Sequence, residues 1–148
     1  MERWICRLIR EEIRAATMGG LTMAIEFLDG EHMTRFLEAV AKLRYTPDSL
    51  PKDWAACLYI LTAHRHLWAR VSKYIDFDRH LVDFSKIRRK VDLAHGLRCM
   101  VDLAGNLYNG GKCSLSELID VTDPRHFEIA LRSIQIRRDG ARILTLPA

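Results

Sequence analysis

Hydrophobic residues recur at three- and four-residue steps along most of this 148-residue chain, with polar residues between them. This period is typical of amphipathic helices that turn one face to a shared core. The first such segment runs from Glu2 to Ala16 and is followed by Gly19 and Gly20, which favour a helix end. We expect residues 1–20 to form a peripheral amphipathic helix docked on the core, with a helix that lies on a membrane surface or a partner as the alternative.

Three further helices are predicted in the first half of the chain. Asp29 can cap a helix from Gly30 to about Arg44, and Pro51 suits the first turn of the next helix. A turn near residues 62–66 should precede another helix over residues 67–75, and residues 76–83 favour a loop with a short extended or single-turn piece. The residues expected to face the core are Met33, Phe36, Leu37, Val40, Leu43, Trp54, Cys57, Leu58, Leu61, Leu67 and Val71.

The longest helical pattern runs from about Lys86 to Tyr108. Its apolar stripe is wide, which predicts one long helix covered on more than one side and therefore at the centre of the fold. Leu97 and Val101 should be fully buried. The helix should end at residues 109–111 (Asn-Gly-Gly), because asparagine and glycine adopt the left-handed conformation that a helix end requires.

Two capping patterns predict the last helices. Ser114 and Glu117 have the spacing of a capping box, and Asp123 followed by Pro124 combines a cap with a first-turn proline. Asp139-Gly140 should end the final helix. Its core-facing residues are expected to be Phe127, Ala130, Leu131 and Ile134.

These patterns predict an all-α fold, a single compact domain of six to seven helices around a central helix at about residues 86–108. The helical core domain is expected over residues 25–140. Residues 141–148 form a C-terminal tail, in which Ile143–Leu146 favours a short strand or an extended arm.

Composition excludes several classes of protein. The chain is 49% hydrophobic and 28% charged, which is a globular balance and not a disordered one. Its apolar runs are short and broken by charge, so we expect no membrane partner and no secretory signal. The four cysteines, at 6, 57, 99 and 113, form no CxxC pair. Reduced thiols and a cytoplasmic location are therefore expected.

Candidate chemistry is sparse. His95 and Cys99 stand one helical turn apart with Cys113 beyond them, but zinc usually takes four ligands and no second pair has metal spacing. Asp76, Asp78 and His80 alternate and could converge on a divalent cation, although Asp and His are also ordinary loop residues. No catalytic motif is present. We therefore predict no catalytic residues, no metal, no cofactor and no enzymatic activity.

The sharpest charge feature is a basic run formed by Lys86, Arg88, Arg89 and Lys90, in a chain with net charge +4. Cations at a helix N-terminus oppose the helix dipole, and a local cost of this kind is expected where residues serve binding. Lys and Arg bind phosphate by releasing counterions. Arg65 and His66, in a His-Arg-His cluster beside Trp68, are added to this candidate binding site, and the alternative is a solvated helix start.

Four segments together resemble a known family: Phe27–Phe36 (FLDGEHMTRF), Ala56–Phe77, Asn106–Gly110 (Asn-Leu-Tyr-Asn-Gly) and Ile129–Arg137. In this order they resemble a small uncharacterised bacterial family, a domain of unknown function common in Firmicutes phages and mobile elements. The resemblance covers about residues 25–138. It implies a helical fold and a mobile-element setting, and it carries no activity and no functional residue.

Together these observations favour a non-enzymatic binding protein of phage or mobile-element origin that modulates a host macromolecule. One concrete form is an inhibitor of a host defence system such as a CRISPR nuclease. The expected partner is a host protein or ribonucleoprotein. The alternative is a nucleic-acid-binding regulator that uses the basic run, and the sequence leaves the oligomeric state open.

Overall fold

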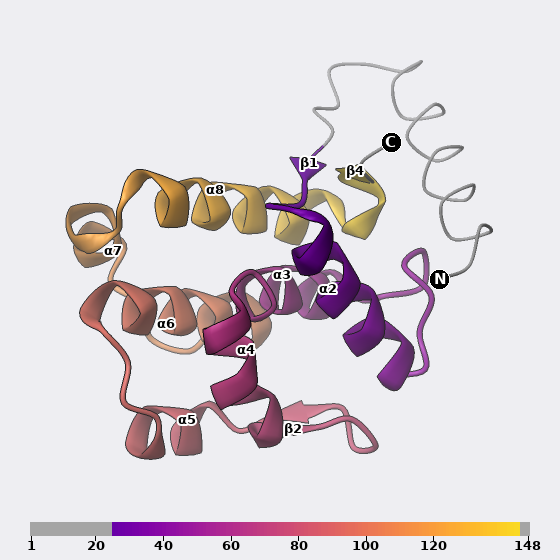
Figure 1. The fold of residues 1–148 in the computed structure, drawn as a ribbon, viewed down its shortest axis with the longest axis horizontal. Coiled ribbons are helices and arrows are strands. Elements are labelled where there is room, and N and C mark those ends of the chain that lie inside the picture. Colours follow the sequence, from indigo (N-terminus) through magenta and orange to yellow (C-terminus); the bar gives the residue numbers. More distant parts are fainter. Residues whose placement is uncertain (1–24, 146–148) are drawn as a thin grey trace.

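The computed structural model describes residues 25–145, which form seven α-helices, two 3₁₀ turns and four two-residue strands (Figure 1). An all-α class is thus confirmed for this part of the chain. The predicted helix over residues 1–20 lies outside the described residues. In chain order the elements are β1 (Ile25–Glu26), α2 (Gly30–Lys42), α3 (Lys52–Leu61), α4 (Arg65–Val71), η1 (Ser72–Tyr74), β2 (Ile75–Asp76), β3 (Leu81–Val82), α5 (Phe84–Lys90), α6 (His95–Asn109), α7 (Leu115–Val121), α8 (Pro124–Asp139), η2 (Ala141–Ile143) and β4 (Leu144–Thr145).

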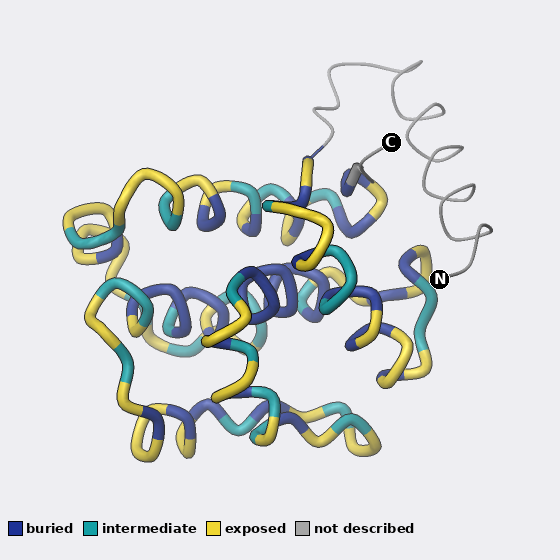
Figure 2. The backbone as a smooth tube through the Cα atoms, viewed as in Figure 1, coloured by how far each residue is buried: buried dark blue, intermediate teal, exposed yellow. Residues whose placement is uncertain are grey.

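The centre of the fold is α3, and the prediction of a central helix at 86–108 is wrong. Every residue from Trp54 to Leu61 is buried, and α3 makes its most extensive contacts with α8 and α6. Figure 2 shows this buried segment in the middle of the molecule. After Asp53 the helix carries no charged side chain, so it can be covered on every side.

The predicted long helix is two helices. α5 ends at Lys90, Val91 is extended (φ −101°, ψ 115°), and α6 begins only at His95. No proline or glycine lies between Lys90 and His95, and the helical spacing of apolar residues runs through the break, which explains why periodicity missed it. Val101 is buried as expected, but Leu97, one turn nearer the start of α6, is only half-buried.

Most predicted helix ends are confirmed, because they depend on hydrogen bonds within one turn. The side chains of Asp29, Ser114 and Asp123 each accept the backbone N–H of the third residue onward, which satisfies an otherwise unpaired donor. Gly110 caps α6 in the left-handed conformation (φ 78°). Gly140, at φ 91°, follows the last residue of α8.

The described part of the C-terminal tail, residues 141–145, contributes to the core. β4 pairs with β1 in parallel, Ile25 opposite Leu144, and Ala141, Ile143 and Leu144 are buried. The predicted short strand is therefore confirmed at residues 144–145. Figure 1 shows how this pairing joins the first and last described segments beside the end of α8.

Candidate functional site

Three of the four residues of the basic run lie at the opposite end of their helix from the one predicted, whereas Lys86 is in the first turn. α5 starts at Phe84, so Arg88, Arg89 and Lys90 occupy its last turn. Cations there interact favourably with the helix dipole. The argument that these residues oppose the dipole and are kept for binding is therefore wrong.

Two cations of the basic run are held by other groups. Lys86 Nζ lies 3.4 Å from the carboxylate of Asp83, the residue that caps α5. Arg88 Nε donates to Asp102 on α6 at 3.0 Å, and its second nitrogen donates to the Lys112 carbonyl at 3.2 Å. Arg89 donates weakly to the carbonyl of Ser85. Arg89 and Lys90 are the cations of the run without an acidic partner within residues 25–145.

The second predicted group, Arg65 and His66, is exposed at the first turn of α4. α5 packs against η1, which follows the last turn of α4, and is joined to α6 by Arg88 and Asp102. No hydrogen bond or ion pair in the described part of the chain joins Arg65 or His66 to the basic run. Trp68 is half-buried and packs against the core, so part of its surface is used within the fold.

His64, the other histidine of that cluster, packs against His126 with ring centroids 4.7 Å apart. Burial lowers the pKa of His64, and His126 adds to the shift. Its Nε2 atom is buried and has no hydrogen-bond partner among the described residues, which favours the neutral ring. We therefore interpret His64 as a packing residue at the start of α4.

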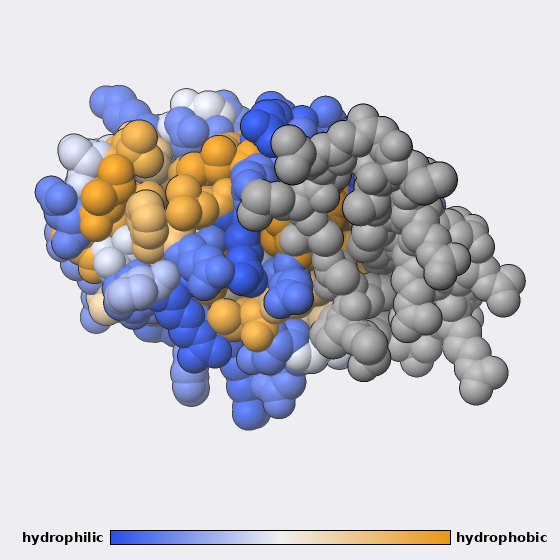
Figure 3. Space-filling model, turned by 90° about the horizontal axis from the view of Figure 1, so that it is seen from above, coloured by the Kyte–Doolittle hydropathy of each residue, from blue (hydrophilic) through white to orange (hydrophobic). Residues whose placement is uncertain are grey.

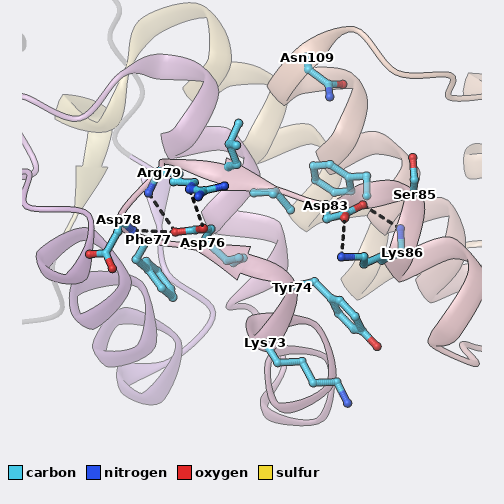
Figure 4. Close-up of a pocket in the computed structure, with 14 residues that line it drawn as sticks. Lys73, Tyr74, Asp76, Phe77, Asp78, Arg79, Asp83, Ser85, Lys86 and Asn109 are labelled. Carbon is cyan, nitrogen blue, oxygen red and sulfur yellow. Dashed lines mark hydrogen bonds and ion pairs between the residues drawn. The ribbon is translucent and has the colours of Figure 1, made fainter.

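The acidic loop at residues 76–83 is a hairpin of β2 and β3, and Figure 4 shows the pocket beside it. Asp76 accepts the backbone N–H groups of Asp78 and Arg79 at 3.1 and 2.9 Å. His80 takes a left-handed backbone (φ 56°) and follows this turn. Asp76 is used to build the turn, and the Asp78 carboxylate lies 3.7 Å from Arg44. Within the described residues, Asp76, Asp78 and His80 do not form a converging group of metal-type donors.

A different group of donors does converge. His95 and Cys99 lie on successive turns of α6, and Glu117 reaches them from α7. One ligand atom from each lies within 4.8 Å of the other two, and His95 Nε2 contacts Glu117 Oε1 directly. Sequence spacing identified His95 and Cys99 but not Glu117, which is 22 residues from His95 along the chain.

The same contact explains a departure from the predicted capping box. Ser114 caps α7 by accepting the N–H of Glu117 at 3.3 Å. In the reciprocal half, the Glu117 carboxylate would accept the N–H of Ser114. Within the described residues that bond is not formed, because the carboxylate turns to His95 instead.

The Asn-Leu-Tyr-Asn-Gly motif is explained by structure. The Tyr108 hydroxyl donates to the His80 carbonyl at 3.0 Å, and its ring packs edge-on against Trp54. Asn106 donates to the Gly111 carbonyl at 2.7 Å, which closes the turn after α6. With Gly110 as the left-handed cap, the motif ends α6 and fastens it to the hairpin and to α3.

The sequence missed an apolar surface. Leu131 and Ile134, predicted to face the core, are 48% and 40% exposed, because α8 turns Ile129, Ala130, Ser133 and Ile136 inward instead. Leu115 and Ile119 on α7 are 58% and 51% exposed. In Figure 3, which looks down on α8, hydrophobic side chains gather at the end where α7 and α8 meet. We call Leu115, Ile119, Leu131 and Ile134 the apolar face.

The described residues 25–145 form a small, mostly helical domain in which His95, Cys99 and Glu117 are the donors that lie together. No helix in this range is both long and apolar enough to cross a membrane. The chain belongs to the family of unknown function DUF6075, whose model matches residues 22–137. This range agrees with the resemblance found in the sequence. Comparison with curated proteins and with solved structures gave no match.

Proposed function

We propose that this chain is a non-enzymatic binding protein that docks a partner protein through the apolar face. One observation carries the proposal. Of the five exposed large hydrophobic residues in the described chain, four lie on α7 and α8. Exposed apolar side chains that gather in one place mark interaction surfaces, whereas single ones are ordinary.

The spacing within each helix fits such a surface. Leu115 and Ile119 are four residues apart on α7, and Leu131 and Ile134 are three apart on α8, so each pair shares one helix side. Both helices also keep buried anchors, Leu118 on α7 and Ile136 on α8, at 1% and 0% exposure. The exposed residues are therefore not needed to hold their own helices to the core.

The contacts of the basic run favour the apolar face as the binding surface. Arg88 already has two partners and Lys86 has one, so an incoming phosphate would have to compete with them. Two free cations give a weak, sequence-independent attachment, because phosphate contacts position a nucleic acid but do not read its bases. A nucleic-acid-binding regulator remains the alternative that the experiment below distinguishes.

The partner in this proposal is a protein of the bacterial host. That choice is supported by the phage or mobile-element setting that the sequence resemblance implies, and inhibition of a host defence nuclease is one form that such binding would take. The apolar face calls for a partner surface with exposed aliphatic or aromatic side chains.

The experiment starts by capturing host proteins on the immobilised chain and purifying the protein retained. Its affinity is then measured for the wild type, Ile119→Glu, Leu131→Glu and Leu81→Glu. Leu81 is the matched control, because it is 55% exposed but lies on β3, away from α7 and α8. A charge placed in the docked surface should weaken binding about 10-fold or more, and Leu81→Glu should not.

Two results would overturn the proposal. Equal affinity for all four proteins would mean that the partner docks elsewhere. A dimer of the chain itself, seen by light scattering and dissolved by Leu131→Glu, would mean that a second copy covers the apolar face. Retention of binding when salt is raised supports the protein interface, whereas a steep loss of affinity with salt supports the nucleic-acid alternative.

A further inference from the structure

The donor cluster of His95, Cys99 and Glu117 combines an imidazole, a thiol and a carboxylate from two helices. These are the three ligand types that zinc takes in proteins. His95 stands on the first residue of α6 and Cys99 one turn later, which places both on the side that meets α7. Glu117 is in the first turn of α7.

The distances are close to those of a bound ion. In a tetrahedral zinc site with ligand bonds of about 2.0–2.3 Å, neighbouring donor atoms lie about 3.3–3.8 Å apart. The three donors here lie within 4.8 Å of one another. His95 Nε2 and Glu117 Oε1 are in direct contact, so a bound ion would replace their hydrogen bond with two metal bonds. Both side chains can rotate to admit it, since they are 57% and 49% exposed.

A second observation concerns the direction of the Glu117 carboxylate. In a capping box it would turn back to the amide of Ser114, yet it turns to the imidazole of His95. Both side chains therefore already face each other at the position that a shared ion would occupy. The thiol of Cys99 lies beneath them in a residue that is 6% exposed.

We propose that His95, Cys99 and Glu117 bind one divalent metal ion of the zinc type, with water as the fourth ligand. A thiolate with an imidazole selects zinc over magnesium or calcium, which prefer oxygen ligands. This proposal differs from the sequence-based prediction of a protein without metal, which considered His95 and Cys99 with Cys113 but not with Glu117.

The ion would fasten α7 to α6. α7 has seven residues and one buried side chain, Leu118, so its attachment by packing is small. An ion bound by Glu117 of α7 and by two residues of α6 would cross-link the two helices at the first turn of α7. This site is independent of the apolar face, so its test and that of the proposed function can fail separately.

The test measures binding of Zn²⁺ and Co²⁺ to the full chain, purified with chelator and then dialysed under reducing conditions. We expect one ion per chain, and Co²⁺ should give the near-ultraviolet thiolate-to-metal absorption that reports a cysteine ligand. His95→Ala and Glu117→Gln should each weaken binding by more than about 100-fold, because loss of even an outer-shell partner costs 10–100-fold. Cys99→Ser should abolish the thiolate absorption.

Two exposed residues provide matched controls. Asp120→Asn changes a carboxylate on α7, and His66→Ala changes an imidazole on α4. Both should bind the ion as the wild type does. A second readout is hydrogen exchange, in which Zn²⁺ should slow the amides of α7 in the wild type and leave them unchanged in Glu117→Gln.

Three outcomes would overturn the proposal. The first is no binding of Zn²⁺ or Co²⁺ at one equivalent. The second is binding that survives both His95→Ala and Glu117→Gln. The third is binding that requires Cys113 but not His95, since it would place the ion on another set of ligands.

Discussion

The guanidinium of Arg88 and the carboxylate of Asp102 are paired at 3.0 Å and join α5 to α6 across the break in the predicted long helix. Arg88 also donates to the carbonyl of Lys112, beyond the end of α6. The sequence alone shows four cations within five residues, and these contacts remove Arg88 from those that are free to bind. Arg88 is a structural link, and only its neighbours in the basic run are available to a phosphate.

Because Arg88 is held by Asp102, the effect of reversing the charge of the other three cations can be predicted. Any affinity for duplex DNA should come from Lys86, Arg89 and Lys90, so Lys86→Glu/Arg89→Glu/Lys90→Glu should abolish it. Two phosphate contacts from Arg89 and Lys90, or three if Lys86 leaves Asp83, correspond to a slope of about −2 to −3 for log K against log salt concentration. The measurement is a salt titration of DNA binding by fluorescence anisotropy. Unchanged binding by the triple variant would mean that other cations, such as Arg65, carry it.

Gly110 should tolerate few residues. Its φ of 78° places it in the left-handed region, and a Cβ there would meet no atom within 4 Å. Backbone strain alone should therefore decide the cost, and Gly110→Val should lower the free energy of unfolding by about 1 kcal/mol or more. Gly110→Asn is the control, because asparagine adopts this conformation more easily. Equal stability of the Val variant and the wild type in chemical denaturation would contradict this account.

The position of α3 predicts a contrast between two leucines. Leu58 is fully buried at the centre of the fold, so Leu58→Ala should cost about 2–5 kcal/mol through lost burial and the cavity left behind. Leu97 is half-buried on α6, and Leu97→Ala should cost less. Thermal or urea unfolding of both variants checks the order, and a larger loss for Leu97→Ala would restore α6 as the central helix.

His32 makes stability depend on pH. The ring is fully buried, its Nδ1 accepts the N–H of Leu28 at 3.0 Å, and its Nε2 lies 2.9 Å from the Tyr59 carbonyl. These bonds require the neutral ring with its proton on Nε2. Burial is the main reason that the pKa of His32 falls from 6.5 to about 4.

The lowered pKa of His32 determines the direction in which stability changes with pH. Below pH 6.5 the unfolded chain takes up a proton at His32, whereas the folded protein does not. The free energy of unfolding is therefore highest above pH 6.5 and decreases as the pH falls towards 4. The loss attributable to His32 should reach about 3 kcal/mol. His64, whose pKa is also lowered by burial, acts in the same direction.

Urea unfolding at several pH values between 7 and 4 tests this prediction. His32→Gln should be less stable than the wild type near pH 7 but should lose less stability on acidification. His66→Gln, which alters an exposed imidazole, is the control and should keep the wild-type loss. An equally steep loss in His32→Gln would assign the pH dependence to other groups.

The sequence by itself determined the helix boundaries that rest on short-range contacts. Asp29, Ser114 and Asp123 each cap a helix through a bond three residues away, and Gly110 ends α6 through its own backbone angle. The same applies to the all-α class and to the buried stripe of α2. These features are fixed by a few consecutive residues, so one sequence is enough to find them.

Only the tertiary structure decided which side of each later helix is buried and which helix lies at the centre. Leu131 and Ile134 have the spacing of core residues, but α3 covers the neighbouring side of α8 and leaves them exposed. Likewise His95 and Cys99 gain Glu117 only because α7 packs back on α6. Burial and the meeting of distant donors depend on where other elements lie in space, and periodicity along one segment carries no information about that.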